Sequence, residues 1–78
     1  MTWYRKFPRI FYLNDGRAIA TLANARDLLL GLPEIQQANI HWRDAGALLI
    51  QAAYRHRQAE IADAHAQFST ALKAEGLI

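Results

Sequence analysis

Cysteine is absent from this sequence of 78 residues. Without it, neither a disulfide framework nor a thiolate metal site can support the fold. A chain of this size buries only about 60–65% of the surface that its unfolded form exposes, so its core is thin. We therefore expect the fold to depend on helix packing or on self-association.

Long hydrophobic runs are also missing. The longest mainly apolar stretch, residues 45–54, is interrupted by Gln51 and is shorter than the roughly 20 residues needed to cross a bilayer. The N-terminal region contains Arg5 and Lys6 but no apolar run of signal-peptide length. These features predict a cytoplasmic protein without a membrane span.

The sequence also has no large excess of one charge, because it contains nine Lys and Arg residues and seven Asp and Glu residues. A formal net charge of +2 does not demand a polyanionic partner. The four glycines are isolated, which excludes a glycine-rich phosphate loop. The single serine, Ser69, lies in a helical pattern without the strained turn of a nucleophile. We therefore expect no enzymatic activity, no catalytic residues and no cofactor.

The strongest local signal is a β-hairpin over residues 9–22, centred on Asn14-Asp15-Gly16. A two-residue turn would place Tyr12 opposite Ile19, whereas a three-residue turn would place Phe11 opposite Ile19, and the sequence leaves both registers open. An isolated hairpin is barely stable in water, so one of its faces must pack on helices or extend a sheet in another subunit. The hairpin edge is therefore a candidate interface.

Three helical patterns follow the hairpin, at about residues 24–31, 40–55 and 58–75. Asn24 is the expected cap of the first helix, and Gly31 and Pro33 end it. The polar segment 34–39 is expected to be a loop.

The last two helical patterns could form one long helix, because no Gly or Pro separates them. A compact monomer requires a break, which we place at residues 55–59. The resulting prediction is an α+β fold of ββααα order, with residues 1–78 forming a single domain.

Several short motifs occur in a recognisable order. They are Phe7-Pro8, Thr21, Ala25-Arg26-Asp27-Leu28-Leu29-Leu30, Leu32-Pro33-Glu34, His41-Trp42-Arg43-Asp44-Ala45, Ala64-His65-Ala66-Gln67-Phe68, Ala71 and Ala74-Glu75-Gly76-Leu77-Ile78. Their order and spacing resemble a family of short alphaproteobacterial proteins of unknown function, common in root-nodule bacteria. The resemblance implies a hairpin followed by three helices and implies no activity.

Aromatic and cationic residues offer the candidate interaction surface. Its predicted members are Trp3, Arg9, Tyr12, Arg17 and Trp42. Trp42 is a large ring in a protein with little core to bury it, and such rings are enriched at the centres of protein interfaces. Packing of Trp42 against the core is the other interpretation.

The N-terminal cations also support an alternative function. Arg5, Lys6, Arg9 and Arg17 alternate with the aromatic residues Trp3, Tyr4, Phe7 and Tyr12. Cations of this kind can bind phosphates while exposed rings stack on bases, which would suit a nucleic-acid-binding accessory protein. A hairpin with inward rings and charged edges has the same pattern.

The three histidines give the third possibility. His41 lies one helical turn from Asp44, a geometry that could hold a metal ion or a small molecule. His56 and His65 do not complete a ligand set with His41, so no metal site is expected. The leading hypothesis is a non-enzymatic protein-interaction or regulatory module that binds a protein partner or a second copy of itself through hairpin edges or helix stripes.

Overall fold

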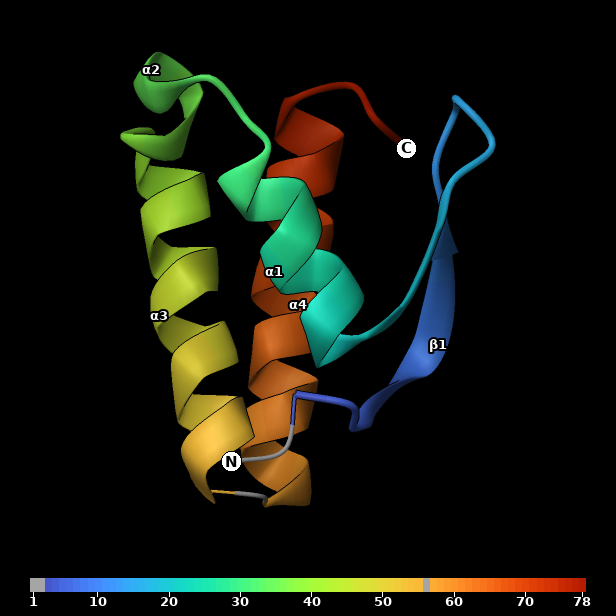
Figure 1. Ribbon diagram of the computed structural model, residues 1–78, viewed down its shortest axis with the longest axis vertical. Helices are drawn as coiled ribbons and strands as arrows, with labels where there is room; N and C mark the ends of the chain where they lie inside the picture. Colours follow the sequence, from blue (N-terminus) through green and yellow to red (C-terminus); the bar gives the residue numbers. More distant parts are fainter. Residues whose placement is uncertain (1–2, 56) are drawn as a thin grey trace.

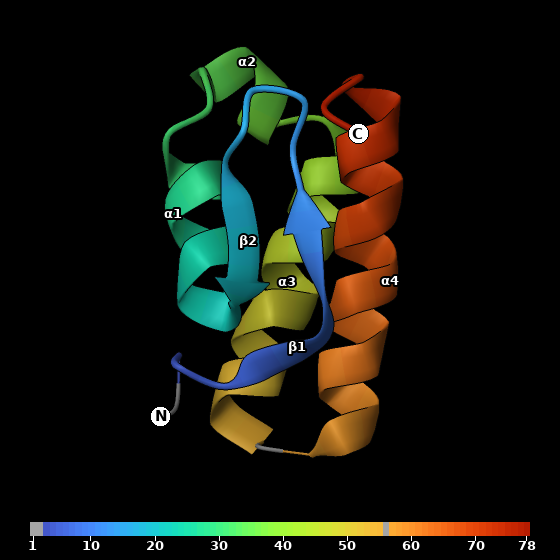
Figure 2. The ribbon, with the colours of Figure 1, turned by 90° about the vertical axis from the view of Figure 1, so that its right-hand side faces the viewer.

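The structure is a computed structural model that describes residues 3–55 and 57–78. Its elements are β1 (Lys6–Tyr12), β2 (Ala18–Thr21), α1 (Leu22–Leu30), α2 (Glu34–Gln37), α3 (Ile40–Arg55) and α4 (Gln58–Ala74). The predicted α+β class, with an antiparallel hairpin followed by helices, is confirmed. The hairpin forms one layer, and the helices lie behind it (Figures 1 and 2).

The hairpin adopts the three-residue register. Phe11 pairs with Ile19, the Leu13 amide donates to the Arg17 carbonyl at 2.9 Å, and the Gly16 amide donates to the Leu13 carbonyl at 3.0 Å. Gly16 has a φ of +93°, which only glycine adopts without strain. This register buries Phe11, Leu13 and Ile19 against the helices.

The strand β1 begins at Lys6, three residues before the predicted start of the hairpin. Its pairing with β2 is irregular between Lys6 and Phe11. Pro8 lies in this stretch and has no amide hydrogen for the ladder.

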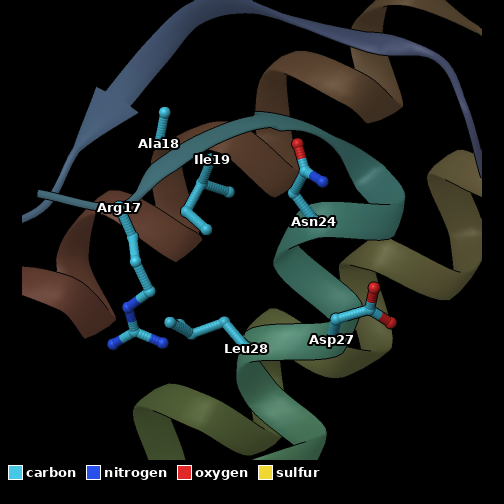
Figure 3. Close-up of a pocket in the computed structure, with 6 residues that line it drawn as sticks. All are labelled: Arg17, Ala18, Ile19, Asn24, Asp27 and Leu28. Carbon is cyan, nitrogen blue, oxygen red and sulfur yellow. The ribbon is translucent and has the colours of Figure 1, made fainter.

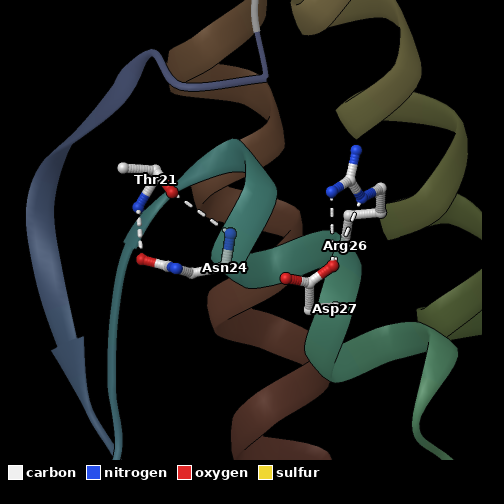
Figure 4. A network of polar contacts seen from close by, with 4 residues as sticks. All are labelled: Thr21, Asn24, Arg26 and Asp27. Atoms are coloured by element: carbon white, nitrogen blue, oxygen red, sulfur yellow. Dashed lines mark hydrogen bonds and ion pairs between the residues drawn. The ribbon is translucent and has the colours of Figure 1, made fainter.

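The start of α1 differs from the prediction, because its N-cap is Thr21 and not Asn24. The Thr21 hydroxyl accepts from the Asn24 amide at 3.1 Å, and Asn24 Oδ1 accepts from the Thr21 amide at 3.2 Å. Asn24 is therefore the third residue of a reciprocal capping box, which is shown in Figure 4.

Segment 34–39 also differs from the prediction, since it contains the single-turn helix α2 and is not only a loop. Gln37 stabilises the turn by donating from Nε2 to the Leu32 carbonyl at 2.7 Å. The remaining helices match the expected break: α3 ends at Arg55 and α4 begins at Gln58.

The core lies between the hairpin and the helices. Its ring cluster joins Phe7 and Phe11 of β1 to Phe68 of α4, with centroid distances of 6.3 and 5.6 Å. Trp42 of α3 meets Phe68 edge-on at 5.5 Å. The helices α3 and α4 pack extensively on each other, and small residues line their buried faces, where Ala45, Ala52, Ala53, Ala64 and Ala71 are completely buried. These alanines allow the two helices to pack closely.

Candidate interaction surface

The structure does not bring the five predicted interaction residues together. Arg9 and Tyr12 lie on β1, where both are exposed, and Tyr12 keeps 71% of its surface. Arg17 is also exposed, but its Nε donates to Asp15 Oδ2 at 2.7 Å. Trp3 is half-buried, and the Arg26 guanidinium lies 4.8 Å from its ring centroid. Arg9 and Tyr12 are therefore the predicted residues most open to a partner.

Trp42 is not a surface residue, and its inclusion in the interaction surface is wrong. The side chain is only 1% exposed and packs against Phe68. The physical reason is that α3 turns this residue toward α4, where the ring fills the centre of the core. The interpretation of Trp42 as a core residue is the correct one.

The N-terminal region offers fewer groups to a nucleic acid than its sequence suggests. Phe7 is buried, Trp3 contacts Arg26, and Arg17 contacts Asp15. A hydrogen bond from the Arg17 amide to Asp15 Oδ1 at 3.0 Å is the main cause that lowers the pKa of the Asp15 carboxyl below 3.8. Nucleic-acid binding stays a prediction that rests on the remaining exposed cations and tyrosines.

A shallow cavity of about 310 Å³ lies between β2 and α1 (Figure 3). Its lining residues are Arg17, Ala18, Ile19, Asn24, Asp27 and Leu28. Each polar side chain in the lining already has at least one partner: Asp15 binds Arg17, the Ala20 and Thr21 amides bind Asn24, and Arg26 binds Asp27 at 3.3 Å. The lining therefore offers few free polar groups for a ligand.

The N-terminus of α1 is not an open anion site. The Leu22 amide donates to the Arg5 carbonyl at 3.0 Å, and the Ala23 amide donates to the Trp3 carbonyl at 2.7 Å. With the capping box, these bonds satisfy the first donors of the helix, which would otherwise attract an anion.

The His41 hypothesis stays a prediction. The Gln67 side chain donates to the backbone carbonyl of His41 at 3.2 Å, which ties α4 to the start of α3. Among residues 3–55 and 57–78, no three His, Asp or Glu side chains gather as metal ligands. His56 lies outside the described residues.

His65 has a role that the sequence did not reveal, because it joins α4 to the hairpin. Its ring stacks on Phe11 with centroids 4.4 Å apart and meets Phe7 edge-on at 5.4 Å. Within the described part of the chain, its Nε2 is buried without a hydrogen-bond partner. Burial lowers the pKa of the His65 imidazole below 6.5, the Arg9 charge acts in the same direction, and a hydrogen bond to the Arg9 backbone opposes them.

We expect acid to destabilise the fold through His65. Because the folded pKa lies below the unfolded one, the unfolded state binds more protons once the pH falls through about 6.5. The free energy of unfolding, measured by urea denaturation, should therefore decrease between pH 7 and pH 5. His65→Leu should flatten this dependence and His41→Leu should retain it; an unchanged slope in His65→Leu would contradict the assignment.

The described helices include none that is both long enough and apolar enough to cross a bilayer.

Exposed apolar side chains follow one face of α3. Ile40, Ile50 and Tyr54 keep 58%, 50% and 60% of their surfaces, and Ala47 is exposed between them. With Arg43 these residues have alternating spacings of three and four, which places them on one helix face. We call Ile40, Arg43, Ala47, Ile50 and Tyr54 the α3 stripe.

An apolar groove borders the α3 stripe on the side of α1. Its volume is about 110 Å³, and it is lined by Trp3, Arg26, Leu29, Leu30, Gly46, Leu49 and Ile50. Gly46 forms part of the lining, where a Cβ would make an ordinary van der Waals contact with Leu29 Cδ1 at 3.5 Å. Leu30 extends the apolar surface onto α1, because 64% of it is exposed.

Two charged side chains on and beside the α3 stripe have no partner among the described residues. Arg43 and Asp44 are exposed, and neither side chain forms an ion pair or hydrogen bond with any other described residue. Arg55 lies 3.7 Å from Glu60 Oε1 but keeps 60% of its side chain exposed. The sequence signal for this surface was the regular spacing of residues 40, 43, 47, 50 and 54 beside the buried helix stripe.

Comparisons with protein families, with curated proteins and with solved structures found no match. The resemblance to the alphaproteobacterial family therefore stays a prediction.

Proposed function

We propose that the protein is a cytoplasmic, non-enzymatic protein-interaction module whose docking surface is the α3 stripe with Leu30. The observation that carries this proposal is the row of exposed Ile40, Ile50 and Tyr54 on α3. Large apolar side chains grouped on one face contribute binding free energy when a partner removes them from water. The adjoining groove adds an apolar recess next to Ile50.

The hairpin is a weaker docking surface than α3. Its outer side also exposes Ile10 and Tyr12, but Lys6 and Arg9 on the same strand are exposed cations. Pro8 also leaves β1 without one backbone donor. Charges and proline on an edge strand oppose strand addition.

The test compares the same substitution at two exposed alanines. Ala47→Glu places a carboxylate within the α3 stripe, whereas Ala62→Glu places it on exposed α4 surface. Epitope-tagged wild-type and variant proteins are expressed in their native cells, cross-linked and purified, and bound proteins, including untagged copies of the chain, are identified by mass spectrometry. Each protein found is then purified, and its dissociation constant is measured directly.

We expect at least one identified protein to bind wild type and Ala62→Glu with similar dissociation constants. Its dissociation constant for Ala47→Glu should be about tenfold higher or more, since binding would remove the new carboxylate from water next to the apolar Ile50. Equal binding of all three proteins, or no direct binder, would refute the α3 stripe as the docking surface.

A further inference from the structure

We propose that the partner on the α3 stripe is a second copy of this chain, with the two α3 helices antiparallel about a two-fold axis. This inference rests on the proposed function and names the partner of the same surface. A two-fold contact uses the same patch on both copies, so the patch must complement itself. The charges of α3 meet this condition in one orientation of the two helices.

Arg43 selects the antiparallel orientation, because it is the one charged residue in the α3 stripe. An axis midway between Ala47 and Ile50 places Ala47 level with Ile50 of the second copy. Arg43 is then level with Tyr54 of the second copy, where the guanidinium can lie over an exposed ring. Parallel helices would place Arg43 against Arg43, where like charges repel.

The polar flank of the stripe supports the same orientation. Asp44 and Arg55 are eleven residues apart in α3, which is about three helical turns, so both lie on one flank. With the axis defined above, Asp44 lies within two residues of the level of Arg55 in the second copy. Both side chains are exposed, and Asp44 has no charged partner among the described residues. The two-fold axis generates this opposite-charge contact twice.

The hairpin does not show the same complementarity. Antiparallel pairing of β1 with β1 of a second copy would bring together Lys6 and Arg9 from both chains. Such a contact brings positive charges of the two chains close together, and β1 contains no carboxylate that could offset them. Self-association is therefore assigned to α3 and not to the hairpin edge.

The size of α3 limits the strength of the dimer. Its 16 residues span about 24 Å, and one helix pair of that length makes a small interface. Interfaces below about 1,200 Å² are typical of weak or transient complexes. We therefore expect reversible dimerisation of micromolar order and not an obligate dimer.

The first experiment is sedimentation equilibrium of the purified protein over a micromolar concentration range. Wild type and Ala62→Glu should show a monomer–dimer equilibrium, and Ala47→Glu should raise the dissociation constant about tenfold or more. Residue 47 is exposed, so the variant should fold like the wild type. Circular dichroism spectra of the two proteins check this. A strictly monomeric wild type, or a dimer that Ala47→Glu leaves unchanged, would overturn the inference.

The second experiment tests the orientation by disulfide cross-linking, which is simple because the chain has no cysteine of its own. Ala47→Cys and Ile50→Cys proteins with tags of different size are mixed and oxidised. The antiparallel dimer predicts that the mixed 47–50 disulfide forms in excess of the 47–47 and 50–50 products. Preferential 47–47 and 50–50 products would show parallel helices and refute the orientation.

Failure of this inference can be distinguished from failure of the proposed function. A monomeric wild type that still binds a different purified protein, with an affinity that Ala47→Glu abolishes, removes the second copy and retains the docking surface. If Ala47→Glu changes neither self-association nor binding of another protein, both proposals are refuted.

Discussion

Replacing Phe68 with Ala is expected to lower the free energy of unfolding by about 3–5 kcal/mol. Phe68 is completely buried and contacts rings from both layers, namely Phe7, Phe11 and Trp42. Removal of its ring leaves a cavity that the surrounding rings cannot fill. Because the total stability of a domain is about 5–15 kcal/mol and this chain is short, the variant should be largely or partly unfolded at 25 °C.

Urea denaturation followed by circular dichroism measures this effect. Tyr12→Ala is the matched control, because it also removes a ring but from a side chain that is 71% exposed. Its effect should be within about 1 kcal/mol. If Phe68→Ala lost no more stability than Tyr12→Ala, the ring cluster would not be the centre of the core.

Replacing Ala64 with Leu is expected to destabilise the protein by about 1–3 kcal/mol. Ala64 is completely buried on α4, the helix that packs most extensively on α3. Three additional carbon atoms have no free volume there, so the two helices must move apart or adopt strained rotamers. Thermal and urea unfolding should both show the loss.

Ala62→Leu provides the control for helix propensity, since Ala62 is exposed on the same helix. Its free energy of unfolding should change by no more than about 0.5 kcal/mol. Equal stability of the Ala64→Leu and Ala62→Leu variants would show that α3 and α4 have room between them.

Local patterns predicted most of the elements, because strand alternation and helix periodicity can be recognised from residues that are close together in the sequence. The hairpin register required tertiary information. Both registers bury apolar side chains, and the observed one is also supported by the C-terminal segment, where the Leu77 carbonyl accepts from the Asn14 amide at 2.9 Å. No local rule reveals a contact between residues so far apart in the chain.

The start of α1 has a similar explanation. Asn24 and Thr21 are both good capping residues, so the sequence alone could not choose between them. Carbonyls of the N-terminal segment satisfy the Leu22 and Ala23 amides, which allows the helix to begin at Leu22. His65 was overlooked because its ring partners lie on β1, at the opposite end of the sequence.

The candidate surface was predicted only in outline. Arg9 and Tyr12 are exposed on the hairpin, as its alternating pattern suggests. Residue type and position could not decide the role of Trp42, since a large ring near a helix start suits an interface or a core equally well. Its burial depends on where the neighbouring helix packs. The α3 stripe required knowledge of which helix face the other elements leave uncovered.

The packing of β1 on α4 also orders events during protein synthesis. The ribosome makes the hairpin first and its packing partner, α4, last among the elements of the fold. Until α4 emerges, Phe7 and Phe11 lack the Phe68 and His65 rings that they contact in the complete structure. A nascent chain that ends before α4 therefore exposes these rings to chaperones or to aggregation, and the fold forms only after residues 58–74 have left the ribosome.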